Sequence, residues 1–301
     1  MKATGNLRVK GISATAFTLA CFLISCDSPT DILSANDAQL VKSESVNVSY
    51  SNEPADISSY VIASLSRLQY AGARTTSEVV SVSDDRLGCN TTTVTLTRTG
   101  TKISPGGEIV IDFGAGCTDS RGVTRKGQIY IKYAGRRWWP ESYIKDSLVN
   151  YYRNGIHIEG VQTMTVQVSA DTTHLQFHNV LENGKVTFID GSFITRSHDI
   201  TREWRRASVA INDQWVTLAG GYAQGNERNG NPYLMTITHE LVEKIQCLSS
   251  KVYIPVSGIE IITIDSNKEY TIDFGNGDCD NIITVTLNGQ SKSISVNPDS
   301  N

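Results

Sequence analysis

The segment THELVEK, which begins at Thr238, places a histidine directly before a glutamate, as in zinc proteases. That chemistry requires His-Glu-x-x-His on a helix, so that two imidazoles on one face bind the metal and the glutamate acts as the base. Glu243 occupies the position of the second histidine, and the surrounding YLMTITHELVEKIQC is typical of a strand. We therefore expect a solvent-facing strand here and no protease site.

Oxygen-bearing side chains are closely spaced in the loop IDFGNGDCDN, where Asp273, Asn276, Asp278 and Asp280 could contact one cation. Such ligands suit Ca²⁺, but no glutamate closes the loop as a bidentate ligand. The alternative is a tight glycine turn, in which Asp273, and Asp112 in a similar earlier loop, accept hydrogen bonds from local backbone amides. The pattern favours the turn and leaves a Ca²⁺ site as the alternative.

The middle of the chain is rich in aromatic residues and arginine, and Trp138, Trp139, Tyr151 and Tyr152 are its candidate ligand-binding residues. Neighbouring residues of a strand point to opposite faces, so at least one of Trp138 and Trp139 should be exposed. Exposed rings can stack on sugars, with arginines supporting them by cation–π contacts, whereas core and cross-strand packing is the favoured alternative. The other members of this group are Trp204, Trp215, Tyr222, Arg136, Arg137, Arg202, Arg205 and Arg206.

Four cysteines accompany an internal repeat. EIVIDFGAGC, from Glu108, is similar to EYTIDFGNGDC, from Glu269, and each has another cysteine 28 or 32 residues before its own. No C-x-x-C spacing supports a zinc site. The repeat therefore predicts two disulfides, Cys89–Cys117 and Cys247–Cys279, one in each of two units that span residues 89–133 and 247–296. Closing each loop should contribute roughly 3 to 4 kcal/mol.

The first 25 residues have the pattern of a signal peptide, with three basic residues and then an apolar run from Ile12 to Ile24. The run is shorter than the roughly 20 residues of a membrane-spanning helix. Leu23-Ile24-Ser25-Cys26 resembles the lipobox of bacterial lipoproteins. This resemblance implies cleavage before Cys26, a diacylglycerol on its thiol and an acyl chain, such as palmitate, on its amine.

Residues 26–53 are polar, poor in aromatic residues and expected to form a tether between the lipid anchor and the folded domain. The expected location is the bacterial cell envelope, with the outer membrane favoured although Asp27 leaves the inner membrane open. Loss of the leader, which carries three basic and no acidic residues, moves the net charge from −4 to −7. An acidic surface argues against nucleic acid as a partner.

The remaining elements are one short helix and many strands. Residues 54–79 form a helical and linker segment, in which Ile57, Val61 and Leu65 share one side and Asp56 is the expected cap. Residues 80–301 contain β-branched alternating runs between Asn-Gly and Asp-Gly turns. We expect an all-β, mostly antiparallel domain, a sandwich or a long curved sheet. The turn dipeptides begin at Asn154, Asn183, Asp190, Asn229 and Asn288.

The lipobox, the repeated IDFGxG-cysteine segment and NYYRNGI, from Asn150, together resemble uncharacterised lipoproteins of the Bacteroidota over roughly residues 85–297. That resemblance implies no catalytic residue and no cofactor. We expect a non-catalytic structural or binding module, held at the membrane through Cys26, with a glycan or an envelope protein as partner. The alternative is an envelope glycan hydrolase, which needs two carboxylates about 5 to 9 Å apart. Glu159 and Asp190 would only be guesses for that pair.

Overall fold

A computed structural model of the chain describes residue 50 and residues 52–65, 77–101, 103–250, 252 and 254–296. By its internal contacts the chain divides into Met1–Asp31 and Ile32–Asn301, and every described element belongs to the second unit. The expected leader, Cys26 and residues 27–49 of the expected tether lie outside the described residues. In the described ranges, no helix has the length and the apolar character needed to cross a membrane.

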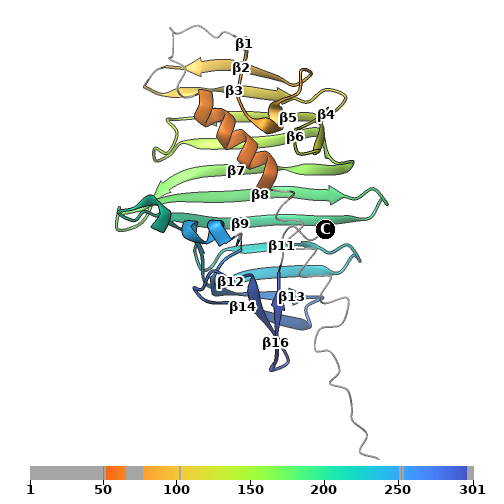
Figure 1. Cartoon of the computed structure of the whole chain (residues 1–301), viewed down its shortest axis with the longest axis vertical. Helices are drawn as coiled ribbons and strands as arrows, with labels where there is room; N and C mark the ends of the chain where they lie inside the picture. Colours follow the sequence, from red (N-terminus) through yellow and green to blue (C-terminus); the bar gives the residue numbers. More distant parts are fainter. Residues whose placement is uncertain are drawn as a thin grey trace, which may run out of the picture. The chain divides into compact units, whose positions relative to one another are not determined.

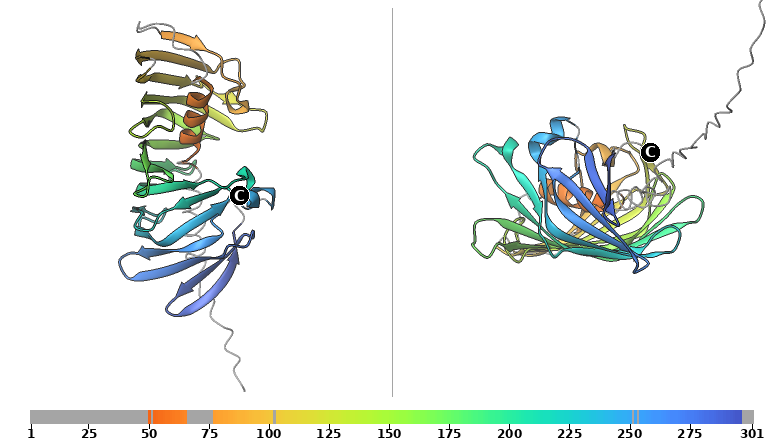
Figure 2. Two further views of the ribbon diagram at one scale, coloured as in Figure 1. Left: turned by 90° about the vertical axis from the view of Figure 1, so that its left-hand side faces the viewer. Right: turned by 90° about the horizontal axis from the view of Figure 1, so that it is seen from below.

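All the strands belong to one antiparallel sheet, in which each strand pairs mainly with its neighbour along the chain (Figure 1). The all-β prediction is confirmed, and of its two architectures the long curved sheet is right and the sandwich is wrong. Most strands are joined to the preceding one by a turn or a loop and pair beside it, so the sheet grows in one direction. In the described part of the chain, no second sheet faces this one. A helix lies within the curve of the sheet instead (Figure 2).

The described residues form 16 strands, and β10 and β11 share one position between β9 and β12. Their bounds are β1 Ser77–Val80, β2 Thr93–Gly100, β3 Pro105–Asp112, β4 Cys117–Thr118, β5 Thr124–Ala134, β6 Tyr143–Arg153, β7 Ile156–Val168, β8 Leu175–Thr187, β9 Phe193–Arg205, β10 Gln214–Thr217, β11 Tyr222–Asn226, β12 Pro232–Lys244, β13 Ser257–Ile264, β14 Lys268–Asn276, β15 Ile282–Leu287 and β16 Gln290–Ser295. Short 3₁₀ turns are η1 Asp85–Leu87, η2 Ala210–Asn212 and η3 Ile245–Ser250.

The N-terminal helix covers residues 52–65 and packs its apolar side on the sheet. Ile57 and Val61 are completely buried in the same core as Ile129 and Ile131 of β5, as the 3.6-residue pattern predicts. The helix begins before Pro54, since residues 50, 52 and 53 are already helical. The prediction that Asp56 caps the helix is therefore wrong, because Asp56 lies inside it.

Charged side chains fix the start of this helix to the sheet. Glu53 Oε1 accepts hydrogen bonds from Arg125 of β5, with Nη2 at 2.6 Å and Nε at 3.2 Å, and Arg125 Nη1 also donates to Asp119 Oδ2 at 2.7 Å. The hydroxyl of Tyr151 on β6 donates to Glu53 Oε2 at 3.3 Å. Because Arg125 is almost fully buried, its two carboxylate partners offset the cost of desolvating the guanidinium.

We call the face that carries the helix the inner face. One cross-strand row on this face runs from β2 to β14 by direct register, and it is apolar except at Asp146, Gln162 and His198. The polar positions lie on the central strands β6, β7 and β9. The members of the row, in order, are Leu96, Ile109, Ile131, Asp146, Gln162, Leu181, His198, Ala223, Met235, Ile262 and Tyr270.

The two repeat units stand towards opposite ends of the sheet, with β2, β3 and β5 in the first and β13, β14 and β15 in the second. Both predicted disulfides, Cys89–Cys117 and Cys247–Cys279, are confirmed. The turn interpretation of the IDFG segments is also confirmed. Asp112 Oδ1 accepts from the Gly114 amide at 2.7 Å, and Asp273 Oδ1 accepts from the Gly275 amide at 2.8 Å. Both glycines have positive φ, which favours glycine at this position.

Most predicted Asn-Gly and Asp-Gly turns connect neighbouring strands, as at Asn154 between β6 and β7 and at Asn288 between β15 and β16. The turn predicted at Asn183 is wrong, because Asn183 and Gly184 lie inside β8. There the register shifts between Leu181 and Gly184, so the pair forms a bulge instead of a chain reversal. The turn predicted at Asp190 is confirmed, and it connects β8 with β9.

Candidate functional site

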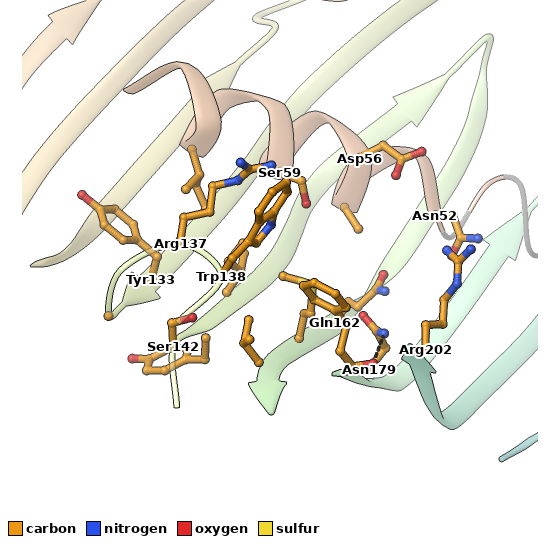
Figure 3. A pocket seen from close by; sticks show the side chains of 18 of the residues that line it. Asn52, Asp56, Ser59, Tyr133, Arg137, Trp138, Ser142, Gln162, Asn179 and Arg202 are labelled. Carbon is orange, nitrogen blue, oxygen red and sulfur yellow. Dashed lines mark hydrogen bonds between the residues drawn. The ribbon is translucent and has the colours of Figure 1, made fainter. Parts of the chain in front are cut away.

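A pocket of about 360 Å³ lies between the N-terminal helix and the inner face (Figure 3). Its walls come from the helix, the end of β5, the loop between β5 and β6, and strands β6 to β10. The volume is at the lower end of the range of small-molecule sites, about 300 to 1,000 Å³, and the lining is mainly apolar with a few polar groups, as such sites usually are. The pocket therefore suits a ligand of one or two rings.

Trp138 and Trp215 line the pocket and form a continuous aromatic cluster with Trp204. The ring of Trp138 meets Trp204 edge-on with centroids 5.1 Å apart, and Trp204 stacks on Trp215 at 5.8 Å. Phe177 tilts against Trp215 at 5.4 Å, and the Trp204 indole N–H donates to Asp213 Oδ2 at 2.9 Å. Such aromatic pairs hold one another in fixed orientations, so this wall is rigid.

Each of these tryptophans has an arginine over its ring. The guanidinium carbon of Arg137 lies 3.8 Å from the Trp138 ring centroid, that of Arg202 lies 5.2 Å from Trp215, and Arg206 lies 5.1 Å from Trp204. Cation–π contacts of this kind orient the planar guanidinium while its N–H groups stay available at its edge. Arg137 and Arg202 line the pocket.

The loop that presents Arg137 and Trp138 has an unusual backbone. Trp138 and Glu141 have φ values of 64° and 68°, in the left-handed region that bulky residues rarely adopt. Hydrogen bonds retain the loop in this form, since Ser142 Oγ donates to the Trp139 carbonyl at 2.7 Å. Backbone strain of this kind is concentrated at functional sites, where it costs on the order of 1 to 3 kcal/mol per residue.

His198 supplies a neutral hydrogen-bond donor. It is 4% exposed, and its Nδ1 lies 3.4 Å from Arg196 Nε, which donates to it. The proton of the neutral ring is therefore on Nε2, which is buried without a hydrogen-bond partner among the described residues. Burial and, to a lesser degree, the charge of Arg196 lower the pKa of His198 to about 3, so the ring stays uncharged at neutral pH.

Asp56 and Arg202 contribute the charges near the start of the helix. Burial raises the pKa of Asp56 above its usual range, while the charges of Arg86 and Arg202 act in the opposite direction. Arg202 donates through Nη2 to Glu243 Oε2 at 2.9 Å. Its Nε is buried without a hydrogen-bond partner in the described part of the chain, which leaves a donor in the wall of the pocket.

The four candidate ligand-binding residues lie in different places. Trp138 lines the pocket, whereas Trp139 lies outside it, 58% exposed, with Arg136 over its ring at 5.1 Å. Tyr151 is buried in the core, and Tyr152, on the opposite face of β6, stacks on His157 at 4.5 Å. The assumption that both tryptophans lie on a strand is wrong, because they belong to the loop between β5 and β6.

Several pocket residues were not singled out from the sequence: Gln162, Asn179 and His198. Asn179 and Gln162 stand at positions whose neighbours two residues away are apolar or glycine, whereas His198 lies between Arg196 and Ile200. Asn179, for example, lies between Phe177 and Leu181, and its amide nitrogen donates to the Phe177 carbonyl at 2.8 Å. A polar residue in the buried phase of a strand is the signal that would have found Asn179 and Gln162.

The residues proposed for Ca²⁺ make local contacts. Besides the turn at Asp273, Asp280 Oδ1 accepts from the Ile282 amide at 3.1 Å. Among the described residues, no group of three or more His, Cys, Asp or Glu side chains is placed to hold a metal ion. The loop with Asp273, Asn276, Asp278 and Asp280 therefore has no geometric support as a metal site.

The residues considered for hydrolysis also lie apart from the pocket. His239 and Glu240 are exposed on β12, which is a strand as predicted. Asp190 pairs with Arg228 at 2.6 Å in a hairpin turn, and Glu159 lies 3.5 Å from His157. In the described lining of the pocket, Asp56 is the one carboxylate.

Comparison of this chain with protein-family models, with curated proteins and with solved structures finds no match.

Proposed function

We propose that this protein is a non-catalytic binding module that holds a small saccharide in the pocket between the helix and the sheet. The observation that carries this proposal is the placement of polar side chains. Gln162, Asn179, His198 and Arg202 interrupt the apolar inner face where the pocket lies. A mainly apolar pocket with convergent hydrogen-bonding groups is the usual form of a small-molecule site. Donors and acceptors spread over neighbouring strands suit the many hydroxyls of a sugar.

The lipid anchor on Cys26 belongs to the same proposal. A diacylglycerol at the start of the tether would hold the pocket close to a membrane surface of the cell envelope. There the module would meet envelope or external glycans. Expression in a Gram-negative host tests this part, since Cys26→Ser should move the protein from the membrane fraction to the soluble fraction.

The alternative, an envelope glycan hydrolase, has less support from the site. Hydrolysis of a glycosidic bond requires two carboxylates on opposite sides of the bond. The described pocket lining offers Asp56 alone, and burial raises its pKa. Binding of a saccharide, unlike its hydrolysis, does not require a second carboxylate.

A glycan array and calorimetry on residues 32–301, which form one compact unit, test the proposal. Trp138 and Trp139 offer a matched pair, because they are adjacent, of the same type and on different sides of the loop. Trp138→Ala should weaken saccharide binding at least tenfold, and Trp139→Ala should leave it unchanged. Equal effects of the two substitutions, or an array on which no saccharide binds, would contradict the proposal.

A further inference from the structure

The faces of the tryptophans are largely occupied by protein groups. Arg137 covers Trp138, Trp138 and Trp215 both contact Trp204, and Arg202 lies over Trp215. These rings therefore offer less free surface for stacking on a sugar than isolated aromatic residues would. Their arrangement orients two guanidinium groups towards the pocket.

Arg137 differs in its partners from Arg202, the other arginine in the described lining of the pocket, and from two arginines outside it. Arg125, Arg202 and Arg205 each form an ion pair with a carboxylate. Arg137 forms no ion pair with any described residue, and its guanidinium lies over the ring of Trp138. Partial burial lowers its pKa, with no carboxylate acting against this effect, yet a guanidinium stays charged at neutral pH.

The positive charge and the neutral donors are distributed along the pocket. Figure 3 shows Arg137 and Trp138 towards one end and Arg202 towards the other, with Gln162 and Asn179 between them. Ser142 at the end of the Arg137 loop and Arg202 are separated by three inter-strand steps, about 14 Å in total. That length accommodates two linked sugar rings.

We propose that the ligand is an acidic saccharide, whose carboxylate or sulfate group binds Arg137 while its hydroxyls accept hydrogen bonds from His198 Nε2 and Arg202 Nε. This inference rests on the proposed function and specifies its ligand. Arginine held edge-on to a pocket suits bidentate recognition of a carboxylate or a sulfate. Neutral donors further along the wall bind hydroxyls without requiring a second negative charge.

An array of disaccharides tests this inference, with each sugar present in a neutral form and as its uronic acid or sulfate ester. The protein with residues 32–301 should bind one or more acidic forms at least tenfold more tightly than the neutral counterparts, and this preference should decrease with added salt. Arg137→Gln should remove the preference, so that acidic and neutral forms of a sugar bind this variant with equal affinity. Arg137→Lys keeps the positive charge and should therefore retain part of the preference for acidic sugars.

Arg136→Gln is the matched control, because Arg136 is adjacent in sequence but lies outside the pocket over Trp139. It should behave like the unchanged protein. Equal binding of neutral and acidic forms, or an unchanged preference in Arg137→Gln, would overturn the acidic ligand and leave the saccharide module standing. An array without binding of either form would overturn both.

Discussion

Asp146 of β6 and Gln162 of β7 are direct cross-strand partners, so a buried acid stands next to an amide that lines the pocket. Asp146 is 5% exposed beneath the N-terminal helix, and its Oδ1 has no hydrogen-bond partner among the described residues. Burial raises the pKa of Asp146 to about 8, with the Ser58 hydroxyl acting weakly in the opposite direction. The inner face thus contains, next to the pocket but outside its lining, a carboxylic acid that is mainly protonated at neutral pH.

This acid should make the stability of the fold depend on pH. Between the unfolded pKa of 3.8 and the folded value of about 8, the native state binds more protons than the unfolded state. The free energy of unfolding therefore falls as pH rises through this window, by on the order of 1 kcal/mol per unit. Asp146→Asn, which stays neutral, should lose this slope and become more stable than the unchanged protein above pH 8. Urea unfolding of both proteins at pH 5, 7 and 9 measures how the free energy of unfolding depends on pH.

Glu182→Gln provides the control for that experiment, since Glu182 is an exposed carboxylate of β8. Its unfolding curves should follow those of the unchanged protein at all three pH values. If the free energy of unfolding of Asp146→Asn fell with pH as steeply as that of the unchanged protein, the pH dependence would not come from Asp146.

Removal of the charge at Glu53 should loosen the helix from the sheet. Glu53→Gln leaves the buried Arg125 with Asp119 as its remaining carboxylate partner and weakens the contact with Tyr151. We expect a loss of about 2 kcal/mol in the free energy of unfolding, the typical value for a hydrogen bond to a charged group. Amide hydrogen exchange should also increase in residues 52–65. Glu78→Gln, which affects an exposed pair with Arg98, should cost less than about 1 kcal/mol.

The two disulfides should stabilise the protein to similar extents, because they close loops of similar length. Each bridge spans 28 or 32 residues, for which the chain-entropy model gives about 3.5 kcal/mol. Replacement of Cys89 and Cys117 by serine should therefore lower the free energy of unfolding by about as much as the same change at Cys247 and Cys279. Denaturant titrations of the two double variants compare them directly. A much larger loss in one variant would show that its bridge also maintains packing at that end of the sheet.

Gly135 should be essential for the loop that carries Arg137 and Trp138. Its φ is 83°, and an added Cβ would lie 2.7 Å from the Cβ of Ser142. Gly191, in the hairpin between β8 and β9, has the same φ but open space around it. Gly191→Ala should cost about 1 kcal/mol from backbone strain alone, and Gly135→Ala should cost more. Only Gly135→Ala should also weaken ligand binding in calorimetry.

The strand-level pattern of this fold was predictable because its signals are local. Asn-Gly and Asp-Gly pairs specify four of the hairpin turns, and the duplicated IDFG segments with their cysteines specify both disulfides. The number of layers was not predictable, since alternating strands suit one sheet or two. Here one helix, residues 52–65, covers part of the inner face that a second sheet would cover in a sandwich.

The site was predictable only in part. Trp138 was one of four candidate ligand-binding residues and lines the pocket, but Tyr151, another of the four, lies in the core. A single sequence does not show which polar residues on different strands lie on the same face of the sheet and opposite one another in register. His198 and Gln162 become neighbours of one pocket only through the register of β6 to β9.

The pairing of successive strands leaves the width of this protein adjustable. Strands β6 to β8 pair only with their neighbours in the chain, so a hairpin gained or lost there would leave the pairing of all other strands in place. The disulfide-bonded units stand towards the two ends, away from such a change. Related proteins could therefore gain or lose strands two at a time in the part of the sheet beneath the pocket. In this way they would fit longer or shorter ligands between the same two ends of the sheet.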